Sequence, residues 1–156
     1  MSDLPADLYT AAQVRELDRT AIEDFGIPGI VLMRRAAAAV VDALLERFPG
    51  AERVCVCCGS GNNAGDGYIV AGMLADKGLD TSVYMVGDPA KLGEDASQAL
   101  EFCRQRDVEF VDGLVPSDVI VDALLGTGAA GTVRDNYSRV IDAVNGSNAS
   151  VVAVDI

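Results

Sequence analysis

The sequence contains no histidine and no tryptophan. Histidine is the side chain that most often transfers protons and binds transition metals, so any proton transfer here depends on Asp, Glu, Lys, Tyr, Cys or water. The first residues carry neither a basic stretch nor an apolar core, and no secretory signal is predicted. The longest apolar run, residues 30–45, is interrupted by Arg34, Arg35 and Asp42, which excludes a membrane span.

Positive charge is scarce in this chain. The 156 residues include 24 acidic and 12 basic side chains, a formal net charge of −12, and the only lysines are Lys77 and Lys91. Such a chain repels nucleic-acid phosphates and anionic lipids, so neither a nucleic acid nor a membrane is expected as a partner. The excess of acid fits either a salt-rich cytoplasm or simple solubility, and the composition leaves both open.

Four cysteines occur, and three of them are crowded into one apolar run: Cys55, Cys57 and Cys58, with Cys103 apart. Neighbours this close cannot form an ordinary disulfide framework. No histidine or second cysteine pair completes a tetrahedral metal site, so packing is the favoured role. Reduced, buried thiols indicate a cytoplasmic protein.

The apolar pattern alternates between strand and helix periods after residue 50, which is typical of an α/β domain. Helices are expected at residues 10–25, 29–48, 68–77, 93–106 and 134–145, and strands at 53–58, 81–86, 108–111, 118–123 and 150–156. Strands separated by such helices pair in parallel through right-handed crossovers. The prediction is one domain over residues 1–156, a Rossmann-like three-layer α/β sandwich whose central, mostly parallel sheet is preceded by two helices. The apolar stripe of the second helix is expected to form core or a dimer face.

A glycine-rich loop follows the first expected strand, where residues 59–67 read Gly-Ser-Gly-Asn-Asn-Ala-Gly-Asp-Gly. The start matches the dinucleotide-binding fingerprint Gly-x-Gly-x-x-Gly in its alanine form. Glycines let the backbone approach a phosphate, and a helix N-terminus supplies N–H donors and a positive dipole. Asn62, Asn63 and Asp66 add polar groups where parallel sheets bind ligands, although Asn and Asp also suit a plain turn or a helix cap.

A second polar turn follows the expected strand 118–123. Asp122 stands among Val, Ile and Leu, where a carboxylate is costly to bury unless it is paired, so it is either a ligand or catalyst or a satisfied capping group. Gly-Thr-Gly follows at residues 126–128, and the last expected strand ends at Asp155. Three polar strand ends are therefore predicted to converge on one edge of the sheet.

Together these segments resemble the YjeF N-terminal domain family, the NAD(P)HX epimerases. The residues that carry the resemblance run in order through nearly the whole chain, at 9–15, 17–18, 26–28, 32–33, 59–67, 122–128 and 154–156. Arg34 departs from the family pattern, which has Glu there, and Ala64 departs from its usual Gly. The family continues past Ile156 with Pro-Ser-Gly, so the sequence is expected to be truncated at its C-terminal end.

The resemblance implies an isomerase of nicotinamide-nucleotide repair. Its substrates would be NADHX and NADPHX, the cofactors hydrated on the nicotinamide ring, whose R and S forms it interconverts for a dehydratase specific for one of them. A bound potassium ion is implied, with Asn63 and Asp122 as ligands. The implied substrate-binding residues are Asn62, Asn63, Ala64, Gly65, Asp66, Gly126, Thr127, Gly128, Ala129, Ala130, Gly131, Thr132 and Asp155. A homodimer, and a fused or separate dehydratase, are the expected partners.

The expected chemistry is proton transfer to and from oxygen, because inversion passes either through loss and return of the hydroxyl or through ring opening. A carboxylate performs such transfers, and Asp122 is the candidate for the catalytic acid and base. Two other functions stay open. A NAD-dependent oxidoreductase explains the glycine fingerprint and gives Asp88 a ribose contact, although a surface loop is favoured for that residue. A non-catalytic binding or scaffold module uses the same fold.

Overall fold

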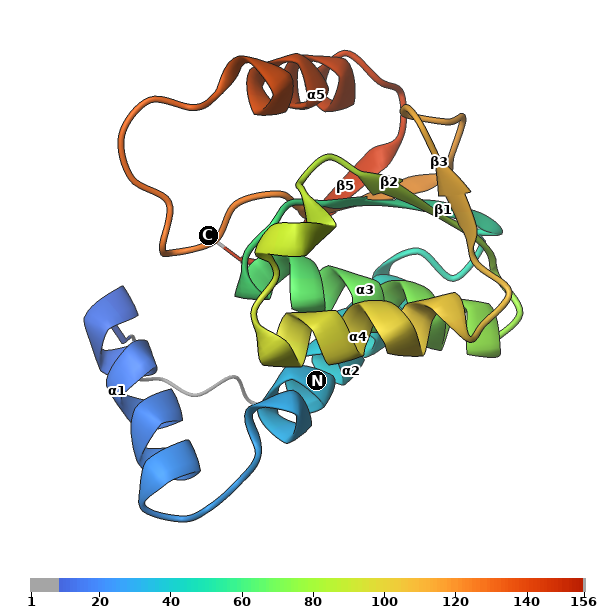
Figure 1. Cartoon of the computed structure of the whole chain (residues 1–156). Coiled ribbons are helices and arrows are strands. Elements are labelled where there is room, and N and C mark those ends of the chain that lie inside the picture. Colours follow the sequence, from blue (N-terminus) through green and yellow to red (C-terminus); the bar gives the residue numbers. More distant parts are fainter. Residues whose placement is uncertain (1–8, 156) are drawn as a thin grey trace.

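The computed structural model describes residues 9–155, which form a three-layer α/β sandwich (Figure 1). The elements in chain order are α1 (Ala11–Glu23), α2 (Gly29–Arg47), β1 (Arg53–Cys58), α3 (Asn62–Asp76), β2 (Asp80–Met85), the 3₁₀ helix η1 (Pro89–Lys91), α4 (Glu94–Arg104), β3 (Glu109–Val111), β4 (Val119–Ala123), α5 (Asp135–Asn145) and β5 (Ser150–Ala153). All five strands pair in parallel in the order β3-β2-β1-β4-β5. Figure 1 shows α2, α3 and α4 on one face of the sheet and α5 on the other, which confirms the predicted Rossmann-like fold.

Each face of the sheet buries its own apolar cluster. Strand alternation turns Val54 and Val56 toward the three-helix side and Cys55 and Cys57 toward α5. Helices cover both faces, which is why β1 consists of almost nothing but buried apolar residues. On α2 the buried side chains are Met33, Ala37, Val41 and Leu44. The stripe of this helix is therefore core, as one of its two predicted roles requires.

All four cysteines are free and buried, as the sequence predicts. Desolvation raises the pKa of Cys58 well above its ordinary value and the pKa of Cys103 to about 12. The thiols of Cys58 and Cys103 therefore stay neutral and fill space in the core. Among residues 9–155, no group of three or more Cys, Asp or Glu side chains is placed to hold a metal ion.

The N-terminal helix α1 begins at the predicted cap. Gln13 N donates to Thr10 Oγ1 at 3.3 Å, and Thr10 N donates to Gln13 Oε1 at 2.8 Å, which completes a capping box. None of its residues is buried. Leu17 within the helix is 55% exposed, and Phe25, which follows the end of the helix, is 75% exposed. Figure 1 shows α1 standing away from the other helices. Neither α1 nor any other helix within the described residues is long and apolar enough to cross a membrane.

The largest difference from the sequence prediction concerns the loop 59–67. The helix was expected to begin at Tyr68, but α3 begins at Asn62, so the second half of the loop is helical. Ala64 lies within this helix. No non-glycine residue of the described chain has a positive φ, so alanine at this position causes no backbone strain. The predicted last strand also ends early, at Ala153, and Ile156 lies outside the described residues.

The prediction of a loop was wrong because the glycines at 65 and 67 lie inside α3, where they allow close packing. A Cβ on Gly65 would lie 2.7 Å from the Met33 sulfur, and one on Gly67 would lie 2.5 Å from the Ala123 Cβ. Glycine costs a helix about 1 kcal/mol relative to alanine. Here that cost is offset because α3 can approach both α2 and the sheet.

Candidate functional site

The strand order places a ligand site at the C-terminal ends of β1 and β4. β1 lies at the centre of the sheet, with β2 and β3 on one side and β4 and β5 on the other. Successive crossovers therefore lead away from β1 in opposite directions. In open parallel sheets, ligands bind in the crevice that forms where the strand order reverses.

Three turns meet at this point with their backbones in contact. Gly59 N donates to Ala123 O at 3.0 Å, which joins the turn after β1 to the end of β4. A Cβ on Gly59 would overlap Leu124 O, and a Cβ on Gly87, which follows β2, would overlap the Gly59 carbonyl. Only glycine fits at these two positions. The ends of β1, β2 and β4 are thus held together at one edge of the sheet.

Asn63 reaches from the first turn of α3 to the turn after β4. Its Nδ2 donates to Leu125 O at 2.9 Å. Because Leu125 O is an acceptor, the amide nitrogen must face it, and Asn63 Oδ1 points the other way. That oxygen is buried and has no hydrogen-bond partner within residues 9–155. A buried polar atom without a partner costs about 1–3 kcal/mol, so it marks a position for a ligand.

Asp155 joins the same cluster from the end of β5. Thr127 N donates to Asp155 Oδ2 at 2.7 Å, which ties the second glycine turn to the last strand. A Cβ on Gly126 would lie 2.6 Å from that carboxylate oxygen and 3.2 Å from the Asn63 Cβ. The structure therefore brings Asn63, Gly126, Thr127 and Asp155 together, and we name these four residues the Asn63 cluster.

Asp122 lies on β4, four residues before the Gly126 of this cluster. Alternation along β4 puts its half-buried side chain on the α5 side of the sheet, with Ile120, whereas Asn63 comes from the α3 side. Leu124 N donates to Asp122 Oδ1 at 3.0 Å. The side chain therefore has the capping contact that the sequence left as one alternative. Within the described chain its second oxygen makes no hydrogen bond.

The pKa of Asp66 is raised far above the ordinary value of an aspartate. Burial raises its pKa to about 7, and the charges of Asp155 and Asp18 contribute to the rise. The sequence predicted substrate contact for Asp66 and gave no sign of this shift. Asp18 belongs to α1, so a helix that precedes the Rossmann-like core influences the charge of the site.

The other predicted contacts are divided between α3 and an exposed loop. Asn62 is exposed at the start of α3, while Ala64 and Gly65 are buried beneath it. No side chain caps α3, since its N-cap is Gly61. The first N–H groups of this helix are therefore available to bind an anion. The remaining predicted contacts lie on the exposed part of the second glycine loop, which continues from Thr127 and is tied back to Gly126 by a hydrogen bond from Ala129 N to Gly126 O at 2.9 Å: Gly128, Ala129, Ala130, Gly131 and Thr132.

A potassium ion fits the donor set at this edge. Potassium prefers several uncharged oxygen ligands with little net charge, as in carbonyl-lined sites. Asn63 Oδ1 is such an oxygen, fixed in direction and lacking a partner within the described chain. The other implied ligand, Asp122, has one carboxylate oxygen that accepts from Leu124 N and a second that makes no hydrogen bond within the described chain.

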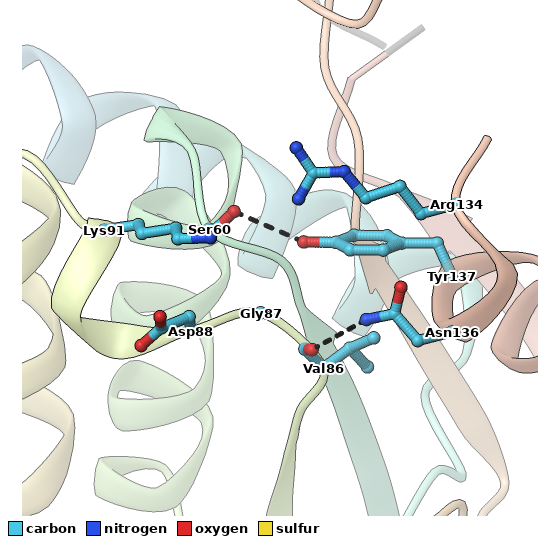
Figure 2. Close-up of a pocket in the computed structure, with 8 residues that line it drawn as sticks. All are labelled: Ser60, Val86, Gly87, Asp88, Lys91, Arg134, Asn136 and Tyr137. Carbon is cyan, nitrogen blue, oxygen red and sulfur yellow. Dashed lines mark hydrogen bonds between the residues drawn. The ribbon is translucent and has the colours of Figure 1, made fainter. Parts of the chain in front are cut away.

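A pocket of about 260 Å³ lies on the other side of the first glycine turn (Figure 2). Of the two glycine-rich loops it includes only Ser60, and none of the predicted substrate-binding residues lines it. Ser60 Oγ and Tyr137 Oη lie 3.3 Å apart and share a hydrogen bond. Asp88 is exposed and accepts a hydrogen bond from Ala90 N at 3.0 Å, which confirms its place in a surface loop. No local sequence pattern connects Ser60 with Tyr137.

The sheet order, the glycine turns and the uncapped helix define a Rossmann-like domain with a ligand site at the switch point. Residues 29–156 match the family model described as YjeF-related protein N-terminus, and the chain belongs to this family. It is 40% identical to the bifunctional NAD(P)H-hydrate repair enzyme Nnr of Coxiella burnetii, over 96% of this chain and 31% of that protein. It is 37% identical to the NAD(P)H-hydrate epimerase of Limosilactobacillus fermentum, over 94% of this chain and 72% of that protein.

The fold is also that of a solved structure. The crystal structure of yeast ynu0, YNL200c, superposes with a TM-score of 0.83 at 21% identity and covers 96% of this chain and 70% of that one. The chain thus spans about three tenths of the bifunctional relative and about seven tenths of the epimerase and of the yeast protein.

Proposed function

We propose that this chain epimerises NAD(P)H hydrates, the hydrated forms of NADH and NADPH. The observation that carries the proposal is the Asn63 cluster at the switch point, in which the amide oxygen of Asn63 is buried without a partner in the described chain and Gly126 lies against both Asn63 and Asp155. The names of the relatives, a NAD(P)H-hydrate epimerase and a bifunctional NAD(P)H-hydrate repair enzyme, support the same reaction.

The proposed substrate lies across the edge of the sheet. Its diphosphate would bind the uncapped N-terminus of α3, where Asn62 and Asn63 N–H groups and the helix dipole favour an anion. The hydrated ring would then lie over the Asn63 cluster. Thr127 and Gly126, held by Asp155, would close one side of the ring site. This placement gives the glycine turns their role, because their backbones can approach the ligand closely.

Asp122 is the proposed acid and base. Its Oδ1 is held by Leu124 N, which fixes the carboxylate and leaves the second oxygen to exchange a proton with the substrate hydroxyl. A potassium ion held by Asn63 and Asp122 would supply a positive charge that steadies negative charge on the substrate. Asp66 is a further candidate for proton storage in the site, because its raised pKa of about 7 allows both protonation states near neutral pH.

The proposed partners follow from α1 and from the relatives. We propose a homodimer through the exposed apolar side chains of α1, since Val14, Leu17 and Ile22 lie on one side of an amphipathic helix that buries none of them. A Leu17→Glu variant would then be a monomer by light scattering, whereas Ala12→Glu, which adds the same charge at an exposed residue on the opposite side of α1, would remain dimeric. A dehydratase, fused or separate, would consume the product, and the buried free thiols suit a cytoplasmic location.

The test is an epimerisation assay with separated R and S NADPHX, in potassium chloride and in tetramethylammonium chloride. We expect interconversion that depends on potassium and that Asp122→Asn lowers by about 10²-fold or more, in the range of a lost general acid–base catalyst. Asp142→Asn removes the same charge from an exposed site on α5 and should leave the rate unchanged. A full rate for Asp122→Asn would exclude its role in proton transfer, and no interconversion by the intact chain would exclude the function.

A further inference from the structure

The pocket beside the first glycine turn is formed by parts of the chain that are distant in sequence. Ser60 follows β1, Gly87 follows β2, Lys91 ends η1, and Arg134 and Tyr137 come from the start of α5. Figure 2 shows the side chains of Lys91 and Arg134 entering from opposite sides and directed toward the hydrogen-bonded hydroxyls of Ser60 and Tyr137.

Two positive charges without acidic partners are unusual in this protein. The chain has a net charge of −12, and Lys91 is one of only two lysines. The ion pairs of residues 9–155 involve Arg19, Arg53 and Arg106, and neither Lys91 nor Arg134 takes part in one. The pocket lining thus contains two cations that form no ion pair within the described chain and one acid, Asp88, and this excess of positive charge favours an anion.

The polar groups between the two cations suit a phosphate monoester. A hydroxyl from Ser60 and one from Tyr137 can each donate to a phosphate oxygen once their mutual bond is broken. Arg134 offers a planar fork of donors that matches phosphate geometry, and Lys91 offers a point charge. Asn136 is already engaged, since its Nδ2 donates to Val86 O at 3.4 Å.

The position of the pocket identifies which phosphate fits. In Rossmann-like sheets the end of the second strand contacts the adenosine ribose, and a basic residue there accommodates a 2′-phosphate. Val86 and Gly87 follow β2 directly, and Lys91 comes a few residues later. Asp88 also lines the pocket and keeps its charge while one of its oxygens accepts a hydrogen bond from Ala90 N, so Lys91 and Arg134 together have to outweigh one acid. At about 260 Å³ the pocket is below the usual size for a whole drug-sized ligand, about 300–1,000 Å³, but suits one end of a dinucleotide.

We propose that this pocket binds the 2′-phosphate of an adenosine ribose through Lys91 and Arg134, so that the chain favours NADPHX over NADHX. The proposal rests on the proposed function for the identity of the whole substrate. The recognition itself concerns only the adenosine end, which lies across the first glycine turn from the Asn63 cluster.

The experiment compares two probes that lack the nicotinamide ring, adenosine 2′,5′-bisphosphate and adenosine 5′-monophosphate, by calorimetric titration of the full chain. We expect the bisphosphate to bind about tenfold more tightly, which corresponds to about 1.4 kcal/mol. Lys91→Gln and Arg134→Gln should each remove most of that difference and leave the affinity for the monophosphate unchanged. Lys77→Gln and Arg139→Gln remove the same charge from exposed positions outside the pocket and should preserve the difference.

Equal affinity for the two probes, or no measurable binding of either, would overturn the proposal. An equal loss of both probes in the Lys91 and Arg134 variants would also overturn it, because the cations would then bind the 5′-phosphate. The epimerisation assay separates this result from the proposed function. Discrimination between the probes without any epimerisation would refute the reaction alone, whereas epimerisation with equal KM for NADPHX and NADHX would refute the phosphate site alone.

Discussion

Replacement of Asp66 by asparagine should stabilise the protein, and only above the ordinary pKa of an aspartate. Burial and the charges of Asp155 and Asp18 raise the pKa of Asp66 from 3.8 to about 7. Between these two values the unfolded chain is ionised at this position while the folded protein keeps the proton. The unfolding free energy therefore falls as pH rises through this window and becomes constant above it. An asparagine has no proton to lose, so the variant does not show this fall.

The size of the effect follows from the pKa shift. A shift of this size corresponds to at most roughly 4 kcal/mol, and because Asp66 is only half-buried we expect about half of it, about 2 kcal/mol. Urea unfolding at about pH 4 and about pH 8 measures the difference between the variant and the parent protein at each pH. The difference should be near zero at the lower pH and about 2 kcal/mol in favour of Asp66→Asn at the higher pH.

A matched control is Asp142→Asn, an exposed aspartate on α5. Its difference from the parent protein should not change with pH. The reasoning about Asp66 is refuted if the Asp66→Asn difference is also independent of pH, or if the variant is the less stable protein at about pH 8. Either result would mean that the folded site stabilises the ionised carboxylate.

Two further predictions concern the site and the core. Potassium at ten times its Kd should add about 1.4 kcal/mol to the unfolding free energy relative to tetramethylammonium, or about 3 °C in Tm. Asn63→Leu should abolish this difference in a thermal melt. A potassium effect that persists in the variant would mean that the ion binds elsewhere. Gly67→Ala should lower the unfolding free energy by about 2 kcal/mol, since its Cβ would lie 2.5 Å from the Ala123 Cβ. Gly50→Ala, which meets nothing within 4 Å, should change stability by less than about 0.5 kcal/mol in the same urea titration, and equal effects would refute the packing argument.

Much of the fold was predictable because β1 and β4 are short, largely apolar runs of the kind that is buried on both faces of a sheet. Helices of ordinary length follow β1, β2 and β4. The parallel sheet and its crossovers follow from that alternation. The start of α3 was not predictable in the same way. Gly65 and Gly67 favour a loop by propensity, and only the positions of α2 and the sheet make glycine the residue that fits the helix.

The sequence predicts where the candidate site lies more readily than it predicts the chemistry there. Polar residues at the ends of apolar strands, Asp122 and Asp155 among them, indicate the C-terminal edge of a parallel sheet, where such sheets bind ligands. The pKa of Asp66 is raised first by burial and then by the charges of Asp155 after β5 and Asp18 in α1, two residues from opposite ends of the chain. The pairing of Ser60 with Tyr137 likewise joins segments 77 residues apart. No local pattern in a single sequence shows which residues distant in sequence lie close together in the fold.

The interlocked turns at Gly59 and Gly87 have a consequence for any attempt to redesign this protein. The backbones of these turns contact each other, so no side chain fits at either glycine, and the close packing restricts movement of one turn relative to the other. Shape changes must therefore come from the flanks: the exposed second glycine loop on one side, and η1 with the start of α5 on the other. A ligand long enough to reach both flanks would cross these two turns. Either flank could therefore be redesigned without changing the other.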